Sequence, residues 1–462
     1  MSGSTGEIAY GRNSHFMSAN VSDFCLNPGA DPALTANPLG LAGLEFVEFA
    51  APHPEKLGAM FESLGFVAVA QHISKRVTLY RQGDMRFLIN GEPDSFAERY
   101  AQEYGVSICA LGLRVSSAKQ AFKKALALGA WPFEGERVGP AELKLPAIQG
   151  IGDSHVYFVD RWPGRVASPP STGIATPAPA VAPSNAPSAL ATSIYEVDFR
   201  PLNAEGAALT GTVVPESTVS SADSLSVSPA AFLAPTDRPP LPRVGLHNVD
   251  HFTQTVGEGR MQEWLDFYRE LFNFREIHDL HPEWRVARSA RVAVSPCGAI
   301  RIPLYEEGTH RTQLMHRFLP DHPGEGVQHI ALASDNIFAT VDALSVRGVE
   351  LIEWPEAYYE QIDLRIPGHG LDVEALRRRN ILVDGVIDSD GTPHLFLQAF
   401  VRHAPGEMFF EIVERRGHAG FGEGSLEALL RSCDAAPASA QGNGQRDDAI
   451  ASGANRNAQH PS

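Results

Sequence analysis

Three ionisable side chains interrupt apolar strands in the second half of this 462-residue chain. His251 lies in VDHFT, His329 in GVQHIAL and Glu411 in MFFEIVERR. Such groups are costly to bury unless they are paired or bind a metal. His329 follows His251 by 78 residues and Glu411 follows His329 by 82, each about one structural module and its connection. We therefore expect the three side chains to converge from equivalent strands.

Two histidines and one carboxylate that leave coordination positions open are a ligand set for non-haem Fe(II). Zinc accepts the same ligands. The competing interpretation is a hydrogen-bonded core residue, the commoner role of a lone histidine in an apolar strand, and the chain has 17 histidines to choose from. The other candidates lie in polar, loop-like stretches: His278, His281, His310, His316 and His322.

A comparison of the two halves of the chain favours the metal. LEFVEF aligns with VDHFTQ, and HVYFVDR aligns with FFEIVER. In this alignment the first half has Phe46, Ala110 and Tyr157 at the three positions. Three separate differences at equivalent strand positions predict a site that only the second copy carries.

The elements that must position these residues follow a repeated pattern. Four times a short apolar strand precedes an amphipathic helix that is closed by Gly or Asn, the residues that tolerate a left-handed backbone. Helices are predicted within 55–65, 117–129, 260–273 and 335–348. A hairpin follows the first helix of each half, turning at Gly83 and around 296–298. The two halves look like duplicates.

Composition divides the chain into folded blocks at 36–161 and 244–433. The stretch 162–243 is rich in Pro, Ala and Ser and is predicted to be a disordered insertion, with one strand near 193–202 where apolar residues alternate. The first thirty or so residues and the tail 434–462 are also predicted to be disordered.

The net charge of −17 disfavours nucleic-acid binding, and the triplet Arg377–Arg379 is interpreted as a solvated helix face. No apolar run is long enough to span a membrane, and the polar N-terminus is unlike a secretion signal. The four scattered cysteines fit reduced thiols and exclude a thiolate zinc site. We expect a cytoplasmic protein.

At these residues the chain resembles the bacterial 4-hydroxyphenylpyruvate dioxygenases of the vicinal oxygen chelate superfamily. The similarity runs through LYRQGDMRFLINGEP, VDHFTQTVGEGRMQEWLDFYRELFNFRE, GEGVQHIALASDNI and MFFEIVERRG. It implies an α+β fold of tandem βαβββ modules that form two open barrel-like domains. It also implies one Fe(II) per chain, held in the C-terminal domain by His251, His329 and Glu411.

The resemblance further implies an aryl keto acid and O2 as substrates, converted to homogentisate and CO2, in a homodimer or homotetramer. The helix that begins near Ser425 would be a lid, and from the sequence Ser425 is expected to cap that helix. The residues implied to line the substrate pocket are three glutamines and three phenylalanines: Gln313, Gln328, Gln398, Phe400, Phe409 and Phe421.

Four positions depart from the family pattern. Ala290 stands in place of a pocket serine, Tyr305 in place of an asparagine, and Ser425-Leu426 in place of the lid's Asn-Phe. A site that hydrogen-bonds a particular group discriminates against analogues that lack it. The alternatives are therefore a related dioxygenase that makes 4-hydroxymandelate, an enzyme for another aryl keto acid, or a paralogue that binds a ligand without catalysis.

Overall fold

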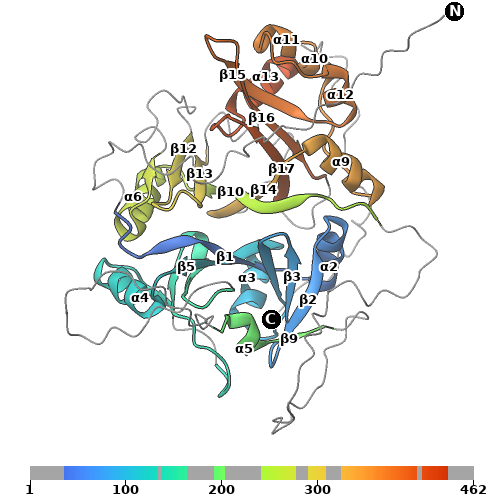
Figure 1. Cartoon of the computed structure of the whole chain (residues 1–462). Coiled ribbons are helices and arrows are strands. Elements are labelled where there is room, and N and C mark those ends of the chain that lie inside the picture. Colours follow the sequence, from blue (N-terminus) through green and yellow to red (C-terminus); the bar gives the residue numbers. More distant parts are fainter. Residues whose placement is uncertain are drawn as a thin grey trace, which may run out of the picture.

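The computed structural model describes residues 36–133, 138–163, 192–202, 241–276, 290–308, 324–402 and 408–434. Within these ranges two mixed sheets lie against one another, and β1 of the first faces β10 of the second (Figure 1). Most of 162–243, the tail after 434 and the first thirty-five residues lie outside the described ranges, as do the five alternative histidines and Gln313.

The N-terminal block builds a nine-stranded sheet in the order β6-β7-β8-β5-β1-β4-β3-β2-β9. Its elements are β1 (Leu41–Ala50), α2 (Pro54–Ser63), β2 (Val67–His72), β3 (Val77–Gln82), β4 (Met85–Asn90), α3 (Phe96–Tyr104), β5 (Ser107–Val115), α4 (Ala118–Ala127), β6 (Pro132–Phe133), β7 (Ala147–Gln149), the 3-10 turn η2 (Ile151–Asp153), β8 (His155–Val159), α5 (Ile194–Asp198) and β9 (Phe199–Pro201).

The C-terminal block builds an eight-stranded sheet in the order β11-β12-β13-β10-β14-β17-β16-β15. Its elements are β10 (Leu246–Val256), α6 (Met261–Phe272), β11 (Arg275–Glu276), β12 (Ala290–Val294), β13 (Arg301–Glu306), β14 (Gly326–Ser334), α9 (Ile337–Val346), α10 (Glu356–Tyr359), α11 (Ile362–Arg365), α12 (Val373–Arg378), β15 (Leu382–Ile387), β16 (Pro393–Phe400), β17 (Phe409–Arg416) and α13 (Glu423–Asp434).

Strand pairing confirms the duplication. In the first block β1 pairs parallel with β4 and antiparallel with β5, which pairs parallel with β8. In the second block β10 pairs in the same way with β13 and β14, and β14 pairs in the same way with β17. Each block therefore contains two strand-helix-strand modules joined through their first strands, as the resemblance implied.

All four predicted helices are present as α2, α4, α6 and α9. Their apolar stripes pack on the sheets, as Leu265, Tyr268 and Phe272 of α6 illustrate by their burial. Asn273 ends α6 with φ 58°, the left-handed conformation expected after a last helical turn. The hairpin at Gly83 is also present, and there φ is +55°.

The strand predicted near 193–202 is corrected by the structure. Residues Ile194–Asp198 form the helix α5, and only Phe199–Pro201 form a strand, which pairs with the edge strand β2. Helix formation wins because Ser193 and Glu196 make a capping box, in which the Ser193 amide donates to Glu196 Oε2 over 2.6 Å. The alternation of apolar residues predicted a strand, whereas the capping box, which is also visible in the sequence, favours a helix.

The two blocks share one hydrophobic core. The Phe410 ring of β17 lies 6.2 Å from the Phe49 ring of β1 and 6.1 Å from the Phe61 ring of α2. The backbone also joins the blocks, because the Asp84 amide donates to the His247 carbonyl over 3.0 Å. The second sheet is thereby held firmly on the first.

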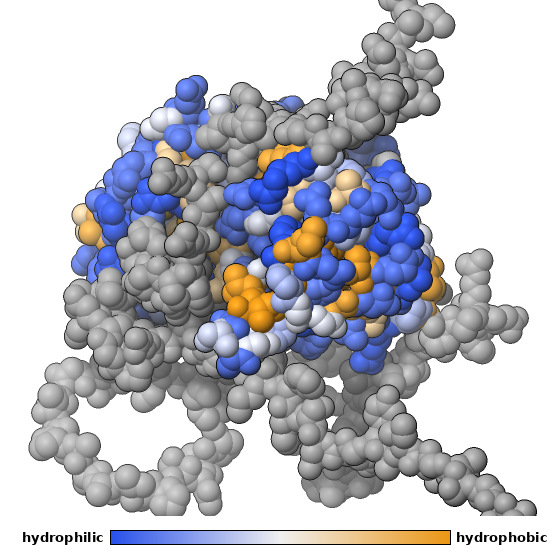
Figure 2. All heavy atoms as spheres, turned by 90° about the horizontal axis from the view of Figure 1, so that it is seen from above, coloured by the Kyte–Doolittle hydropathy of each residue, from blue (hydrophilic) through white to orange (hydrophobic). Residues whose placement is uncertain are grey.

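One face of the molecule shows where polar and apolar residues gather on the surface. The face in Figure 2 is mostly hydrophilic with separate hydrophobic patches. Arg377 pairs with Glu374 and Glu356, and Arg379 pairs with Asp342, so the arginine triplet is partly neutralised on the helix surface. Among the described helices, none combines the length and apolar character needed to cross a bilayer.

Candidate metal centre

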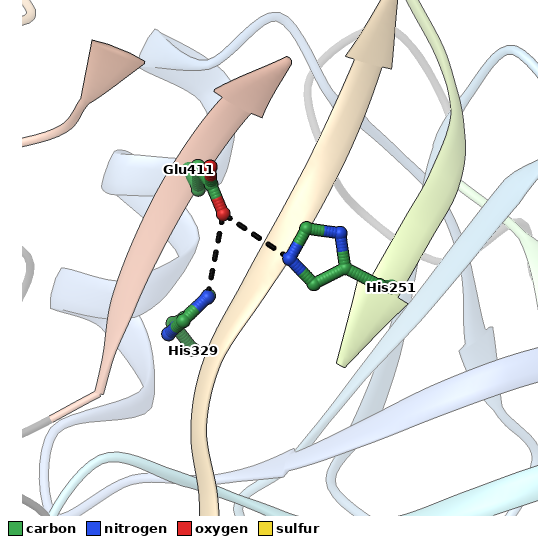
Figure 3. A group of neighbouring side chains, drawn as sticks. All are labelled: His251, His329 and Glu411. Carbon is green, nitrogen blue, oxygen red and sulfur yellow. Dashed lines mark ion pairs between the residues drawn. The ribbon is translucent and has the colours of Figure 1, made fainter. Parts of the chain in front are cut away.

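Three neighbouring strands bring the predicted trio together. Ala331 of β14 pairs with His251 of β10 on one side and with Glu411 of β17 on the other. His329 lies two residues before Ala331 on β14, so alternation of side chains points it to the same face. Figure 3 shows the three side chains turned toward one another from these strands.

The ligand atoms surround one point. Glu411 Oε2 lies 3.3 Å from His251 Nε2 and 3.3 Å from His329 Nε2. All three residues are at most 5 % exposed. The second carboxylate oxygen, Glu411 Oε1, is buried without a hydrogen-bond partner among the described residues. Buried polar atoms normally have partners, so this oxygen indicates a missing ligand.

The other nitrogen of each imidazole is already engaged. His251 Nδ1 donates to Asp250 Oδ1 over 2.8 Å, and His329 Nδ1 contacts Gln328 Oε1 at 3.2 Å. A hydrogen bond at Nδ1 fixes the tautomer and leaves the Nε2 lone pair for a metal. Two imidazole nitrogens and a carboxylate, with space on one side, therefore fit a divalent transition metal.

Electrostatics favour the ionised form of the Glu411 carboxylate. Burial alone would raise the pKa of the Glu411 carboxyl, but hydrogen bonds from His251 and His329 outweigh it and lower that pKa. Burial lowers the pKa of His329. The pKa of His251 is raised despite its burial, because Asp250 and Glu411 accept hydrogen bonds from its ring. A cation at this point would take the place of the shared proton.

At the positions that correspond to the trio, the first block has Phe46, Ala110 and Tyr157. Its three counterparts occupy the corresponding register, since Gly112 pairs with Tyr157 as Ala331 pairs with Glu411. The Phe46 and Tyr157 rings lie 5.9 Å apart, and a Cβ added to Gly112 would come within 2.5 Å of the Phe46 ring. Aromatic side chains therefore fill the position that the second block leaves to polar ligands.

A small pocket opens beside the trio. Of the residues implied by the resemblance, Gln398, Phe400, Phe421, Tyr305 and Leu426 line it. Sequence reasoning missed five further lining residues, of which the apolar ones carried no distinguishing signal: Thr253, Trp354, Leu382, Gly422 and Leu429. Larger cavities of about 730 and 870 Å³ exist elsewhere, but neither contains the trio.

Two of the implied pocket residues support His329 instead of lining the pocket. The Phe409 ring stacks on the His329 ring at 4.6 Å with an angle of 24°. Gln328 is 1 % exposed and contacts His329 Nδ1 through its amide oxygen. The structure therefore places both residues around a candidate ligand, and Gln313 lies outside the described residues.

The prediction that Ser425 caps the last helix is wrong. Helix α13 begins at Glu423, and Ser425 is a fully buried residue whose Oγ accepts from the Tyr358 hydroxyl over 3.3 Å. The first amides of the helix have other acceptors, because Asp384 Oδ2 accepts from the Gly424 amide over 2.7 Å. Asp384 of β15 therefore takes the place of a local cap. The sequence around α13 does not reveal this long-range contact.

Ala290 and Tyr305 are a matched pair. They are directly opposite in the antiparallel pairing of β12 with β13, and both are buried. Opposite residues of such a pair share one face of the sheet, so the small side chain leaves room for the large one. The two departures from the family pattern are therefore changes at neighbouring positions, of which Tyr305 lines the pocket.

Comparison with known proteins agrees with this fold. Residues 35–200 match the model of the hydroxyphenylpyruvate dioxygenase N-terminal domain, and residues 248–361 match the glyoxalase/bleomycin resistance protein/dioxygenase superfamily. The fold and the paired modules thus define a vicinal oxygen chelate enzyme, a metal-dependent class.

Two curated relatives match over most of both chains. The chain is 38% identical over 404 residues to a 4-hydroxyphenylpyruvate dioxygenase of Pseudomonas sp., covering 87% of this chain and 96% of the relative. It is also 38% identical over 402 residues to a Vibrio vulnificus protein named hemolysin VllY, covering 86% and 95%. The chain belongs to the 4-hydroxyphenylpyruvate dioxygenase family.

Solved structures give the same fold. A fusion of a xylose isomerase-like TIM barrel with a 4-hydroxyphenylpyruvate dioxygenase matches with a TM-score of 0.60 and 27% identity over 88% of this chain and 54% of that one. A mutant 4-hydroxymandelate synthase from Streptomyces coelicolor matches with a TM-score of 0.54 and 22% identity over 85% and 98%.

Proposed function

We propose that this chain is an Fe(II)-dependent dioxygenase that converts 4-hydroxyphenylpyruvate and O2 to homogentisate and CO2. The observation that carries the proposal is the convergence of His251, His329 and Glu411 on one buried point, with Glu411 Oε1 lacking a partner among the described residues. The family membership supports the substrate. One iron per chain would be held by these three residues.

When held by these residues, the iron would supply Lewis acidity toward the keto acid and O2. The protein would orient the ring and exclude water. Gln398 is 4 % exposed in the pocket and offers an amide to a polar group of the substrate. Phe400 and Phe421 present apolar faces beside the trio, and such walls keep water from a reactive site.

We propose that α13 moves when the substrate enters. The pocket beside the trio has a volume of only about 40 Å³, whereas sites for small organic ligands are typically roughly 300 Å³ or more. Leu426 and Leu429 of α13 form part of its wall. Displacement of this helix would enlarge the pocket without disturbing β10, β14 or β17, so we assign α13 the role of a lid.

The experiment is anaerobic loading of the purified chain with Fe(II), followed by O2 and 4-hydroxyphenylpyruvate. We expect release of CO2 and formation of homogentisate, identified by mass and chromatography against a standard. Release of CO2 with 4-hydroxymandelate as product would replace the proposed reaction with the benzylic one. No CO2 from this substrate, together with release from phenylpyruvate, would assign a different keto acid.

A paralogue that only binds a ligand is the second candidate, and the altered pair Ala290 and Tyr305 is its support. The buried trio weighs against it, because three ionisable side chains in one apolar cup cost folding energy that a metal-free protein has no reason to retain. We also propose a cytoplasmic homodimer or homotetramer, on the basis of the family resemblance. Light scattering of the purified protein measures the oligomer.

A further inference from the structure

Asp250 lies directly behind the candidate ligand His251 and uses both of its carboxylate oxygens. Oδ1 accepts from His251 Nδ1 over 2.8 Å and from Arg415 Nη2 over 2.7 Å. Oδ2 accepts from Arg415 Nε over 2.7 Å and from Arg301 Nη1 over 3.3 Å. Asp250 is 5 % exposed, so this network is held in a medium where charge pairing is strong.

Arg415 reaches past Asp250 to the segment that precedes α13. Its Nη1 donates to the carbonyl of His418 over 3.0 Å and to that of Gly420 over 2.6 Å. The guanidinium also lies 4.9 Å from the centre of the Phe421 ring. That ring packs edge-on against the His251 ring at 5.0 Å and lines the pocket. One arginine thus contacts both the support of a metal ligand and the pocket wall.

The first block contains a corresponding acid-arginine group without the metal ligands, which shows what such a group does in the structure alone. There Glu45 takes the position of Asp250, and its carboxylate pairs with Arg86 of β4 at 3.7 Å and Arg114 of β5 at 2.5 Å. The duplicate strands therefore keep a buried acid-arginine group even where the adjacent position is Phe46. In the second block the bidentate arginine comes instead from β17, the strand that carries Glu411.

We propose that Asp250 and Arg415 form a positioning clamp for the metal centre and the pocket wall. The clamp holds the His251 imidazole with Nε2 toward the metal and fastens the segment 418–421 in the closed arrangement. This inference rests on the proposed metal site. A chain with a loosened clamp would bind metal more weakly and would also release Phe421, whereas a merely structural ion pair would affect only stability.

The geometry specifies which substitutions separate these roles. Arg415→Lys keeps one positive charge but cannot make the planar bidentate contact and reach two carbonyls together. Asp250→Asn keeps an oxygen for His251 Nδ1 but loses the charge that pairs with Arg415. Arg114→Lys makes the same change as Arg415→Lys in the block without the trio and is the matched control.

The experiment measures cobalt(II) binding to the full chain by its visible absorption and by competition with a chelator. We expect the cobalt dissociation constant to rise about 10- to 100-fold for Arg415→Lys and Asp250→Asn, with a changed absorption band. We expect less than a twofold change for Arg114→Lys. Limited proteolysis with cobalt bound should cut within 418–421 faster in Arg415→Lys than in the parent or the control.

The outcomes distinguish failure of the proposed metal site from failure of the proposed clamp. A parent protein that binds no cobalt would overturn the proposed metal site itself. Normal cobalt binding by the parent and by both clamp variants would overturn the clamp alone, as would equal losses in Arg415→Lys and Arg114→Lys. Circular dichroism identifies folded variants, and Asp250→Asn decides the question if Arg415→Lys does not fold.

Discussion

Glu411 is the residue on which the proposed chemistry depends most directly, because its carboxylate contacts both imidazoles and is the only acid of the trio. Glu411 is only 2 % exposed, and a carboxylate buried to this extent would be unfavourable without a cation beside it. Tyr157 occupies the same register in the first block and contacts Phe46 there. The two residues therefore form a natural pair of test and control.

We predict that Glu411→Ala loses bound iron and that Tyr157→Ala keeps it. Removing the carboxylate takes away one of three ligands, whereas the tyrosine lies in the other sheet. Iron content after gel filtration, measured by elemental analysis, checks both variants. Equal loss of iron in the two proteins would mean that the comparison of the duplicates does not locate the metal.

The pair Ala290 and Tyr305 provides a test of specificity. We predict that the double variant Ala290→Ser with Tyr305→Asn raises the preference for 4-hydroxyphenylpyruvate over phenylpyruvate about tenfold, because a buried hydroxyl and amide can pair with the phenol of the substrate. The ratio of kcat/KM for the two substrates is the measurement. If the ratio of kcat/KM stays within twofold of the parent's, these two positions do not discriminate between substrates by the ring hydroxyl.

At the scale of elements, β8 and β17 are equivalent strands of the two blocks, but β8 contributes to packing whereas β17 carries the candidate ligand Glu411. His155 begins β8 at the register position that Phe409 takes in β17. It stacks between the rings of Phe96, at 3.7 Å, and Phe133, at 3.4 Å. Burial lowers the pKa of His155 to about 3. This histidine is therefore a neutral aromatic filler in the first block.

The pKa of His155 leads to a prediction about acid stability. Between its unfolded pKa of 6.5 and its folded pKa of about 3, the unfolded chain binds a proton on this ring that the folded chain does not. Its contribution to the free energy of unfolding is therefore present above pH 6.5 and falls by about 1.4 kcal/mol per pH unit below it. Below the folded pKa the loss is complete.

We predict that His155→Leu removes this slope from the metal-free protein. Urea unfolding of the parent and the variant at several pH values between 4 and 7 gives the difference directly, since the other buried histidines contribute equally to both. Parallel curves of unfolding free energy against pH would contradict a neutral, buried His155.

At the scale of the whole molecule, the catalytic sheet is stabilised by the sheet that lacks the trio. Phe410 is 1 % exposed between the blocks, although its neighbour Glu411 faces the pocket. Alternation along β17 thus directs one residue to the candidate metal centre and the next to the shared core. The N-terminal block would serve as a scaffold that keeps β17 in place.

We predict that Phe410→Ala lowers the free energy of unfolding of the metal-free protein by about 3–5 kcal/mol while the chain still unfolds in one transition. The cause is the cavity left among Phe49, Phe61 and the second sheet. Val67→Ala, at a residue that is 60 % exposed, should change stability little and serves as the control. Calorimetry that resolves two transitions, only one of them shifted, would show that the blocks unfold independently.

The sequence by itself determined the repeat, the four module helices and the three candidate ligands. Each of these carries a local signal: helical spacing of apolar residues, or an ionisable residue such as His329 within an apolar strand. Ser193 and Glu196 carry a local signal too, because their capping box favours a helix over the strand that the alternation at 194–199 predicts. Where the physical cause is local, the order of residues suffices to predict the outcome.

Tertiary structure alone decided what supports the ligands. Arg415 is 165 residues from Asp250 in sequence, yet its guanidinium contacts both carboxylate oxygens. Ser425 could not be assigned without Asp384, which caps α13 from another strand. These contacts depend on how strands pair and how a helix docks, because long-range geometry is fixed by packing and leaves no periodic trace in the sequence.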